Sequence, residues 1–155
     1  MLSNQQISDR IELEQLVVAY AYAIDERAFE RLDRIFTPDA HIDYRAAGGI
    51  AGSYPEIRKW LPEALGIFPG YMHFIGNFAF DIDGDSARGR VACINPMVLP
   101  KADGSAGEGE TMFFGLWYLD RYRRTAEGWR IVERVEKRSF DYNMPEVFKQ
   151  AMKRD

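Results

Sequence analysis

The second half of the chain constrains the fold most, because from Tyr71 to Phe140 it has the alternating pattern of long β-strands. Two turn signals interrupt this pattern: Asp83-Gly84-Asp85, which is typical of a tight hairpin, and the segment 125–128. We therefore predict antiparallel strands at 71–83, 86–99, 110–123 and 129–140. The glycine-containing polar segment 101–109 is expected to be a flexible connection.

The N-terminal segment has helical periodicity instead. Its apolar residues recur every three or four positions: Leu13, Leu16, Val17, Tyr20 and Ile24. Ser8 is the predicted N-cap of this helix, and Asp25 ends its apolar face.

Two shorter helices and one strand are expected before Tyr71. A short helix is predicted over 28–36, with Thr37-Pro38-Asp39 ending it, and a strand over 40–45. The sequence Ser53-Tyr54-Pro55-Glu56 is a capping box, so a third helix should begin near Pro55.

Helices followed by a run of antiparallel strands indicate an α+β fold. We expect the N-terminal helices to pack on a strongly curved, mixed but mostly antiparallel β-sheet that forms a cone with an interior pocket. The chain has 155 residues, enough for one domain with a core and too few for two ordinary ones. Residues 1–155 are therefore predicted to form a single domain.

Composition excludes several classes of function. The formal net charge is −4 with both signs interspersed, which argues against nucleic acid as a partner. Cys93 is the only cysteine, so the chain has neither an intrachain disulfide nor a cysteine-based metal site. The polar N-terminus and the absence of a long apolar run predict a cytoplasmic protein without membrane contact.

The predicted outer face of the sheet is more apolar than a solvated face should be. It would carry Phe113, Trp117, Ile131 and Val135. Because exposed apolar patches usually mark interfaces, we expect a homodimer or homotrimer that associates sheet to sheet.

His73 is the leading candidate for chemistry. It is one of two histidines, and it lies in the strand segment 71–80 among aromatic and apolar neighbours. Histidine is the default general base or acid near neutral pH. The alternative is a half-buried strand histidine that bonds a neighbouring backbone group. Asp25 is a second candidate, because a carboxylate at a helix C-terminus is disfavoured by the helix dipole and needs a cationic or N–H-donating partner.

Four segments of the chain resemble the SnoaL-like, nuclear-transport-factor-2-like family. They are 25–45 (DERAFERLDRIFTPDAHIDYR), 73–78 (HFIGNF), the IDGDSARG hairpin and the ending GWRIVER at 128–134. The resemblance covers about residues 11–140 and implies the α+β cone. Within the family, the IDYR and HFIG motifs are similar to those of scytalone dehydratases, and hexachlorocyclohexane dehydrochlorinases are also similar. The family contains dehydratases, isomerases, cyclases and inactive domains, so its fold does not determine the reaction.

The resemblance implies roles for individual residues. Asp25 and His73 would form a dyad in which Asp25 orients the general base His73, and Tyr44 would polarise the substrate. Arg134 matches a pocket-facing arginine of the dehydrochlorinases. Ile24, Met97 and Tyr118 depart from the scytalone dehydratase pattern, which has a tyrosine, a histidine and an asparagine there. The residues expected to bind substrate are therefore Tyr20, Asn95, Met97, Tyr118 and Arg134.

Three functions remain open at this point. The first is a lyase that needs no cofactor and removes a proton and a leaving group from a small, hydrophobic, cyclic substrate, as a dehydratase does. The second is an isomerase, which would use the same residues. The third is a binding module or partner subunit, which would have a plugged pocket or a His73 out of reach of Asp25.

A metal site is the weakest alternative. His41 and Asp43 could join His73 as ligands, but strand alternation places them opposite Tyr44 and away from a pocket that Tyr44 faces. No metal is therefore expected, and Cys93 is expected to be a packed side chain and not a nucleophile.

Overall fold

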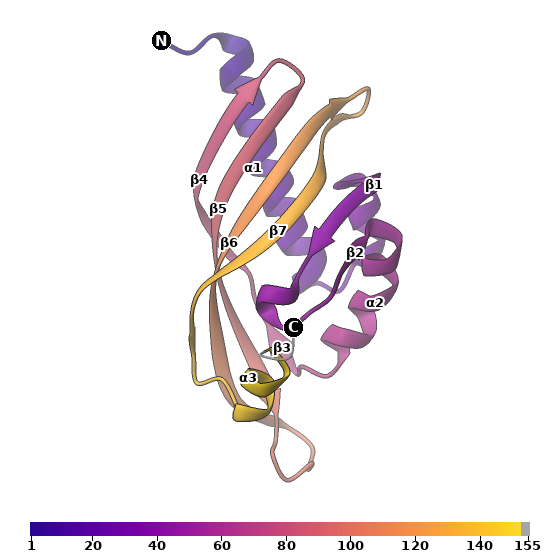
Figure 1. The fold of residues 1–155 in the computed structure, drawn as a ribbon, viewed down its shortest axis with the longest axis vertical. Coiled ribbons are helices and arrows are strands. Elements are labelled where there is room, and N and C mark those ends of the chain that lie inside the picture. Colours follow the sequence, from indigo (N-terminus) through magenta and orange to yellow (C-terminus); the bar gives the residue numbers. More distant parts are fainter. Residues whose placement is uncertain (153–155) are drawn as a thin grey trace.

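The computed structural model describes residues 1–152 (Figure 1). The N-terminal part contains the helix α1 (Asn4–Asp25), the 3-10 helix η1 (Phe29–Arg34), β1 (Phe36–Asp43), the 3-10 helix η2 (Arg45–Ala47), β2 (Ala51–Ser53) and α2 (Tyr54–Gly66). The remainder contains β3 (Gly70–Tyr71), β4 (Phe74–Asp83), β5 (Ser86–Pro100), β6 (Glu108–Thr125), β7 (Gly128–Tyr142) and α3 (Glu146–Met152).

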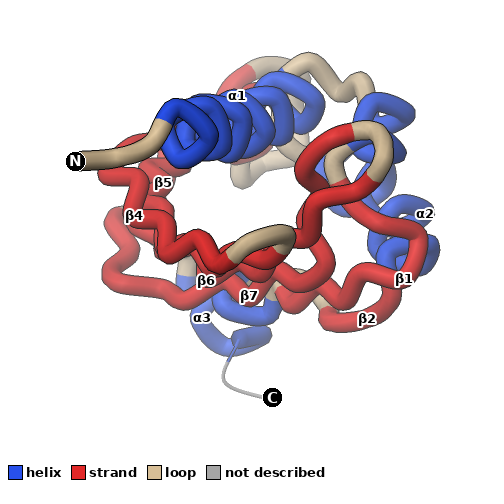
Figure 2. The backbone as a smooth tube through the Cα atoms, turned by 90° about the horizontal axis from the view of Figure 1, so that it is seen from above, coloured by secondary structure: helices blue, strands red, loops and turns tan. Residues whose placement is uncertain are grey.

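The strands form one mixed sheet in the order β2-β1-β7-β6-β5-β3, with β4 also paired to β5. Only β1 and β7 run parallel among these pairs, and the others are antiparallel. The sheet curves strongly and α1 lies along its open side, where it packs against β4 and β7 (Figures 1 and 2). The predicted α+β cone is confirmed.

The core fills the space between α1 and the concave face of the sheet. The predicted helical face is buried at Leu13, Val17, Tyr20 and Ile24, and Leu16 is half-buried against it. Met112, Phe114, Leu116 and Tyr118 project inward from β6 at every second position. This two-residue period is what a strand with one buried face requires.

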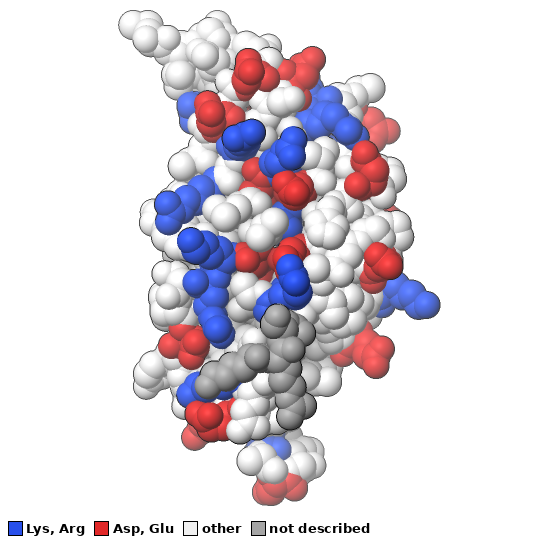
Figure 3. Space-filling view, in the orientation of Figure 1, with Lys and Arg blue, Asp and Glu red and all other residues white. Residues whose placement is uncertain are grey.

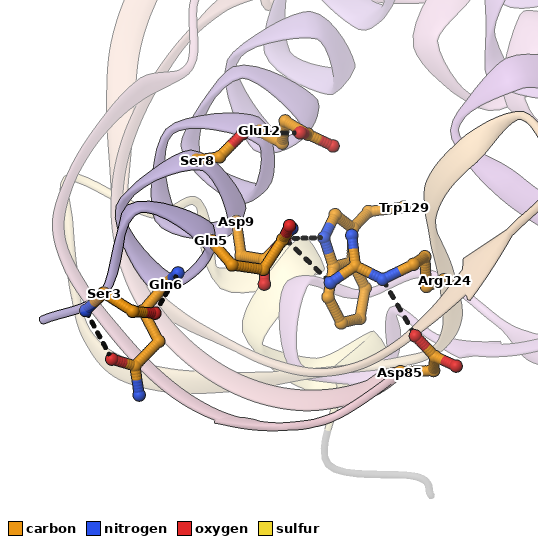
Figure 4. Close-up of polar contacts among 9 residues, drawn as sticks. All are labelled: Ser3, Gln5, Gln6, Ser8, Asp9, Glu12, Asp85, Arg124 and Trp129. Atoms are coloured by element: carbon orange, nitrogen blue, oxygen red, sulfur yellow. Dashed lines mark hydrogen bonds and ion pairs between the residues drawn. The ribbon is translucent and has the colours of Figure 1, made fainter.

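The first helix begins at Asn4, so the prediction that Ser8 caps it is wrong. Ser3 is the N-cap, and its side chain and that of Gln6 form a capping box. Ser8 lies one turn inside the helix, where its hydroxyl donates to Glu12 (Figure 4).

A buried polar cluster fastens the first turns of α1 to the sheet (Figure 4). The Asp9 carboxylate accepts hydrogen bonds from Arg124 (2.7 Å), Gln5 (2.9 Å) and the Trp129 indole (3.3 Å). The Arg124 guanidinium lies over the Trp129 ring and also bonds Asp85 at the β4–β5 turn. The cluster therefore joins α1 to β6, to β7 and to the β4–β5 turn, all of which are distant from it in the sequence.

The second predicted helix is shorter than expected. It is the 3-10 helix η1, and Thr37, Pro38 and Asp39 do not interrupt the chain but belong to β1. Pro38 is tolerated because this strand pairs irregularly with β7 between Phe36 and His41. β1 ends at Asp43, so Tyr44 follows the strand and precedes η2.

The predicted outer face of the sheet is wrong at Ile131. Arg121 pairs with Glu133 and Tyr122 with Ile131, so Val132 is an extra residue in β7. This bulge changes the alternation and places Ile131 and Arg134 on the buried side together. Ile131 is therefore a core residue and does not lie on the outer face of the sheet.

The predicted turns and the third helix are confirmed. β4 and β5 join at Gly84 and Asp85, and the Ser53–Glu56 capping box begins α2. In the segment 101–109, β6 already begins at Glu108. Among residues 1–152, no helix is long and apolar enough to cross a bilayer.

Candidate functional site

His73 and Asp25 form a close, directed pair. The Nδ1 atom of His73 lies 2.6 Å from Oδ1 of Asp25. The backbone N–H of His73 donates to both carboxylate oxygens, at 3.1 and 3.0 Å. An ionised carboxylate only accepts hydrogen bonds, so Nδ1–H is the donor in this contact, and the neutral ring that makes it has its lone pair on Nε2. The partner that an aspartate at a helix C-terminus needs is thus His73.

A break in the strands brings the two residues together. A continuous strand was predicted through His73, but β3 ends at Tyr71 and β4 begins at Phe74. In this gap the Met72 N–H still donates to the Pro96 carbonyl, while the His73 N–H turns toward Asp25. The Tyr71 hydroxyl donates to the Ile24 carbonyl and ties the break to the end of α1.

The His73 ring lines a cavity of about 280 Å³ between the concave face of the sheet and α2. Its side chain is only 9% exposed. Most of the cavity wall is apolar and includes Trp60, Leu65, Phe68, Met97, Met112, Phe114, Leu116 and Phe148. Among the described residues that line it there is no lysine or arginine. This volume is near the lower end of ligand pockets and suits one small molecule.

Tyr20 and Tyr44 supply a pair of hydroxyl groups to the cavity wall. Their oxygens are 2.8 Å apart, and both side chains line the cavity. The Tyr20 ring also meets the His73 ring edge to face, with centroids 6.2 Å apart. Burial raises the pKa of both phenols well above the usual value, so they remain protonated at neutral pH.

Arg134 and Tyr118 do not line the cavity and lie behind Tyr20. The guanidinium is fully buried between the rings of Tyr20 and Tyr118, 4.1 Å from each centroid. It forms a bidentate ion pair with Asp120, at 2.8 and 2.6 Å. The expectation that Arg134 faces the pocket is therefore wrong, because its charge is committed to Asp120. Tyr118 also turns away, and its hydroxyl contacts the Cys93 sulfur at 3.4 Å.

Asn95 and Met97, two of the expected substrate-binding residues, line the cavity, and Glu136 is a lining residue that the sequence did not suggest. Burial raises the pKa of Glu136 to about 8; the nearby Arg134 charge lowers it, and Asp120 and Asp43 raise it. The available signal was that Glu136 follows Arg134 by two residues, so both share one face of β7.

His41 and Asp43, which were considered as metal ligands together with His73, lie elsewhere. His41 is exposed, and Asp43 binds the backbone and side chain of Arg45. Within residues 1–152, no group of three or more His, Cys, Asp or Glu side chains is arranged to hold a metal ion. Burial raises the pKa of the Cys93 thiol to about 12, so it is a poor nucleophile.

Comparison with known families assigns the chain. Residues 5–135 match the model of the SnoaL-like domain. The chain belongs to the SnoaL-like family. A relative within it is the uncharacterized protein Rv2910c of Mycobacterium tuberculosis, which is 53% identical over 144 residues, or 93% of this chain and 95% of that protein.

Solved structures of SnoaL-like folds superpose closely on this chain. A protein of Novosphingobium aromaticivorans, assigned provisionally as a scytalone dehydratase, has a TM-score of 0.80 and 17% identity and covers 93% of both chains. Hexachlorocyclohexane dehydrochlorinase LinA-type3 of Novosphingobium barchaimii has a TM-score of 0.72 and 16% identity over 88% of this chain and 90% of its own. At these identities the likeness concerns the fold.

Proposed function

We propose that this SnoaL-like protein is a cofactor-independent lyase of the dehydratase type. His73 removes a proton next to an activating group of the substrate, and a leaving group departs from the neighbouring carbon. Asp25 orients the histidine, and Tyr44 polarises the activating group. The observation that carries the proposal is the 2.6 Å contact between Asp25 and His73 at the wall of a cavity.

The dyad has what a general base requires. Nε2 is unprotonated in the tautomer that Asp25 selects, and the carboxylate stabilises the imidazolium that forms when the base accepts a proton. The apolar wall reduces solvation of this pair, which strengthens the electrostatic interaction between its members.

The tyrosine pair suits the polarising role. One hydroxyl donates to the other, so the accepting hydroxyl keeps its own hydrogen for a substrate oxygen. A donor aimed at an oxygen on which negative charge develops stabilises the transition state of proton removal. Because burial disfavours both phenolates, the tyrosines donate hydrogen bonds but do not give up protons.

The cavity favours a small, neutral, hydrophobic substrate. Its wall is mostly apolar, and the described lining residues offer no cation to pair with a carboxylate or phosphate. A flat ring with one or two oxygens would match the aromatic and aliphatic wall. The names of the two structural neighbours, a dehydratase and a dehydrochlorinase, both describe eliminations.

A pure binding module would be indicated by a filled pocket or a separated dyad. The cavity is open over about 280 Å³, and the dyad atoms are in hydrogen-bond contact. Both observations support the enzyme in preference to a binding module or partner subunit.

Proton abstraction can be tested without the natural substrate. Cyclohexanone and 2-tetralone are incubated with the protein in D₂O, and deuterium entry next to the carbonyl is followed by NMR. We expect the wild type to accelerate exchange, and His73→Ala and Asp25→Asn to slow it by about 10²–10⁴-fold, the usual contribution of a positioned general base.

His41→Ala is the matched control, because His41 is the other histidine and is exposed. It should exchange like the wild type. The dyad also predicts a downfield Nδ1–H proton resonance that is present in the wild type and in His41→Ala and absent from His73→Ala. Exchange that is equal in the wild type and in His73→Ala would refute the proposed function.

A further inference from the structure

Two buried polar atoms of residues that line the cavity have no hydrogen-bond partner. They are Oε2 of Glu136 on β7 and Oδ1 of Asn95 on β5, and each lacks a partner among the described residues. The side chains belong to residues that are 9% and 3% exposed, and both line the cavity that His73 lines. A buried polar atom without a partner costs on the order of 1–3 kcal/mol, so a site that retains two of them is suited to a polar ligand group.

From this placement we infer that Glu136 and Asn95 form the leaving-group subsite of the cavity, that its ligand group is a hydroxyl, and that the Glu136 carboxylic acid is the general acid that protonates it. The inference rests on the proposed function and names the leaving group of that reaction. It assigns the acid role to Glu136, a role that the buried tyrosines cannot fill.

The chemistry of the two atoms matches a hydroxyl group. The amide oxygen of Asn95 only accepts hydrogen bonds, and a protonated Glu136 donates one. A hydroxyl can both donate to an amide oxygen and accept from a carboxylic acid, so its hydrogen-bonding capacity matches both residues. A carboxylate or a halide has no hydrogen to offer Asn95, and a ketone oxygen likewise can only accept.

The surroundings of Glu136 favour its protonated form. The nearest cation, Arg134 on the same strand, lowers the pKa of Glu136, but it forms a bidentate ion pair with Asp120 on β6, whose negative charge acts in the opposite direction. Asp43 on β1 adds negative charge, and the titratable groups that also interact with Glu136 are the neutral phenols of Tyr20, Tyr44 and Tyr118 and the Cys93 thiol. Burial thus raises the pKa of Glu136 to about 8, so most of it is protonated at neutral pH.

The elimination balances with these groups. His73 Nε2 takes a proton from the carbon next to the carbonyl, and the electron pair of that C–H bond becomes the new C=C bond. The C–O bond on the next carbon breaks, its electron pair stays on oxygen, and the Glu136 proton converts the departing hydroxyl to water. Transfer of one proton from imidazolium to the Glu136 carboxylate, directly or through solvent, restores both groups.

The test compares two probes that share a reacting C–H bond. 3-Hydroxycyclohexanone can lose water to give cyclohexenone, whereas cyclohexanone carries the same carbonyl without the leaving group. We expect Glu136→Gln to slow dehydration by about 10²–10⁴-fold and to slow deuterium exchange into cyclohexanone far less, because exchange has no leaving group to protonate. The matched control is Glu133→Gln, a partly exposed glutamate of the same strand, which should change neither rate.

A second measurement does not depend on activity. The infrared spectrum of the wild type at pH 7 should contain the carbonyl band of a buried protonated carboxyl group. The band should shift when cyclohexanol is added and be missing from Glu136→Gln. An unshifted band would mean that the Glu136 carboxyl group does not hydrogen-bond the cyclohexanol hydroxyl, which would contradict the inference.

The outcomes separate the two proposals. If His73→Ala does not reduce exchange into cyclohexanone, the proposed lyase fails, whatever Glu136 does. If exchange depends on His73 but Glu136→Gln dehydrates like the wild type, or slows exchange and dehydration equally, the assignment of Glu136 as the acid is overturned. Absence of the infrared band would overturn it as well.

Discussion

At the scale of single residues, Arg134 supports the wall of the cavity although it does not line the cavity itself. Its guanidinium is fully buried, stacks between two tyrosine rings and pairs with Asp120, to which the Tyr122 hydroxyl also donates. The planar fork of arginine suits both contacts, and lysine would reproduce neither. Through the Tyr20 ring, Arg134 helps to hold the hydroxyl pair at the cavity wall.

This arrangement predicts the effect of breaking the ion pair. Arg134→Met should lower the free energy of unfolding by about 3–5 kcal/mol, because Asp120 would be left as an unpaired buried charge. The double variant Arg134→Met with Asp120→Leu should recover most of that loss, since it removes both charges. Urea denaturation of the three proteins measures this, and a single variant as stable as the wild type would contradict it.

At the scale of secondary-structure elements, the dyad depends on where α1 lies. The C-terminus of α1 carries Asp25, and its N-terminal half is fastened by the Asp9 cluster to Arg124 and Trp129 (Figure 4). The helix is therefore attached to the sheet near both ends. A loss of either attachment would alter the position of Asp25 relative to His73.

Asp9 also predicts a dependence of stability on pH. Burial alone would raise the pKa of its carboxyl, but hydrogen bonds from Arg124, Gln5 and Trp129 outweigh this and lower it below the ordinary value of 3.8. A carboxyl with a lowered pKa in the folded state stabilises the fold above its unfolded pKa and loses this contribution as pH falls through the folded pKa. Asp9→Asn should therefore be less stable at pH 7 by about 1–3 kcal/mol.

The predicted pH dependence is tested by thermal unfolding of both proteins at pH 7 and below pH 3. The difference between wild type and Asp9→Asn should shrink at the lower pH. Asp39→Asn, in an exposed ion pair with Arg123, serves as the control and should have a small effect at both values. A difference for Asp9→Asn that is independent of pH would refute the role of the carboxylate charge.

At the scale of the whole molecule, the outer face of the sheet carries a row of exposed apolar side chains. Phe74 pairs with Ile94, Ile94 with Gly115 and Gly115 with Phe140, so the row crosses β4, β5, β6 and β7. The three side chains are 71%, 38% and 50% exposed. In the view of Figure 3, basic and acidic side chains are spread over the visible face of the molecule, with uncharged surface between and beside them.

This row replaces the patch that the sequence suggested, since Ile131 is buried and Phe113, Trp117 and Val135 are half-buried. We still predict a homodimer or homotrimer that covers it with a second copy of the chain. Phe140→Asp should shift the protein to monomers in sedimentation, whereas Ile11→Asp, on exposed α1, should not. A wild type that stays monomeric at every concentration would contradict the prediction.

The order of elements, the hairpin at Gly84 and the pairing of Asp25 with His73 follow from local patterns and from the family resemblance. Periodicity indicates which residues face inward as long as the period is unbroken. The aspartate at the end of the first helix, Asp25, requires a partner. The burial of Ile131 and the place of Glu136 at the cavity followed from neither, because the extra residue Val132 changes the alternation of β7. The break before Phe74 likewise arises from contacts with α1 and Pro96. Bulges and breaks depend on the partner strand, so only the assembled sheet determines which side chains surround the cavity.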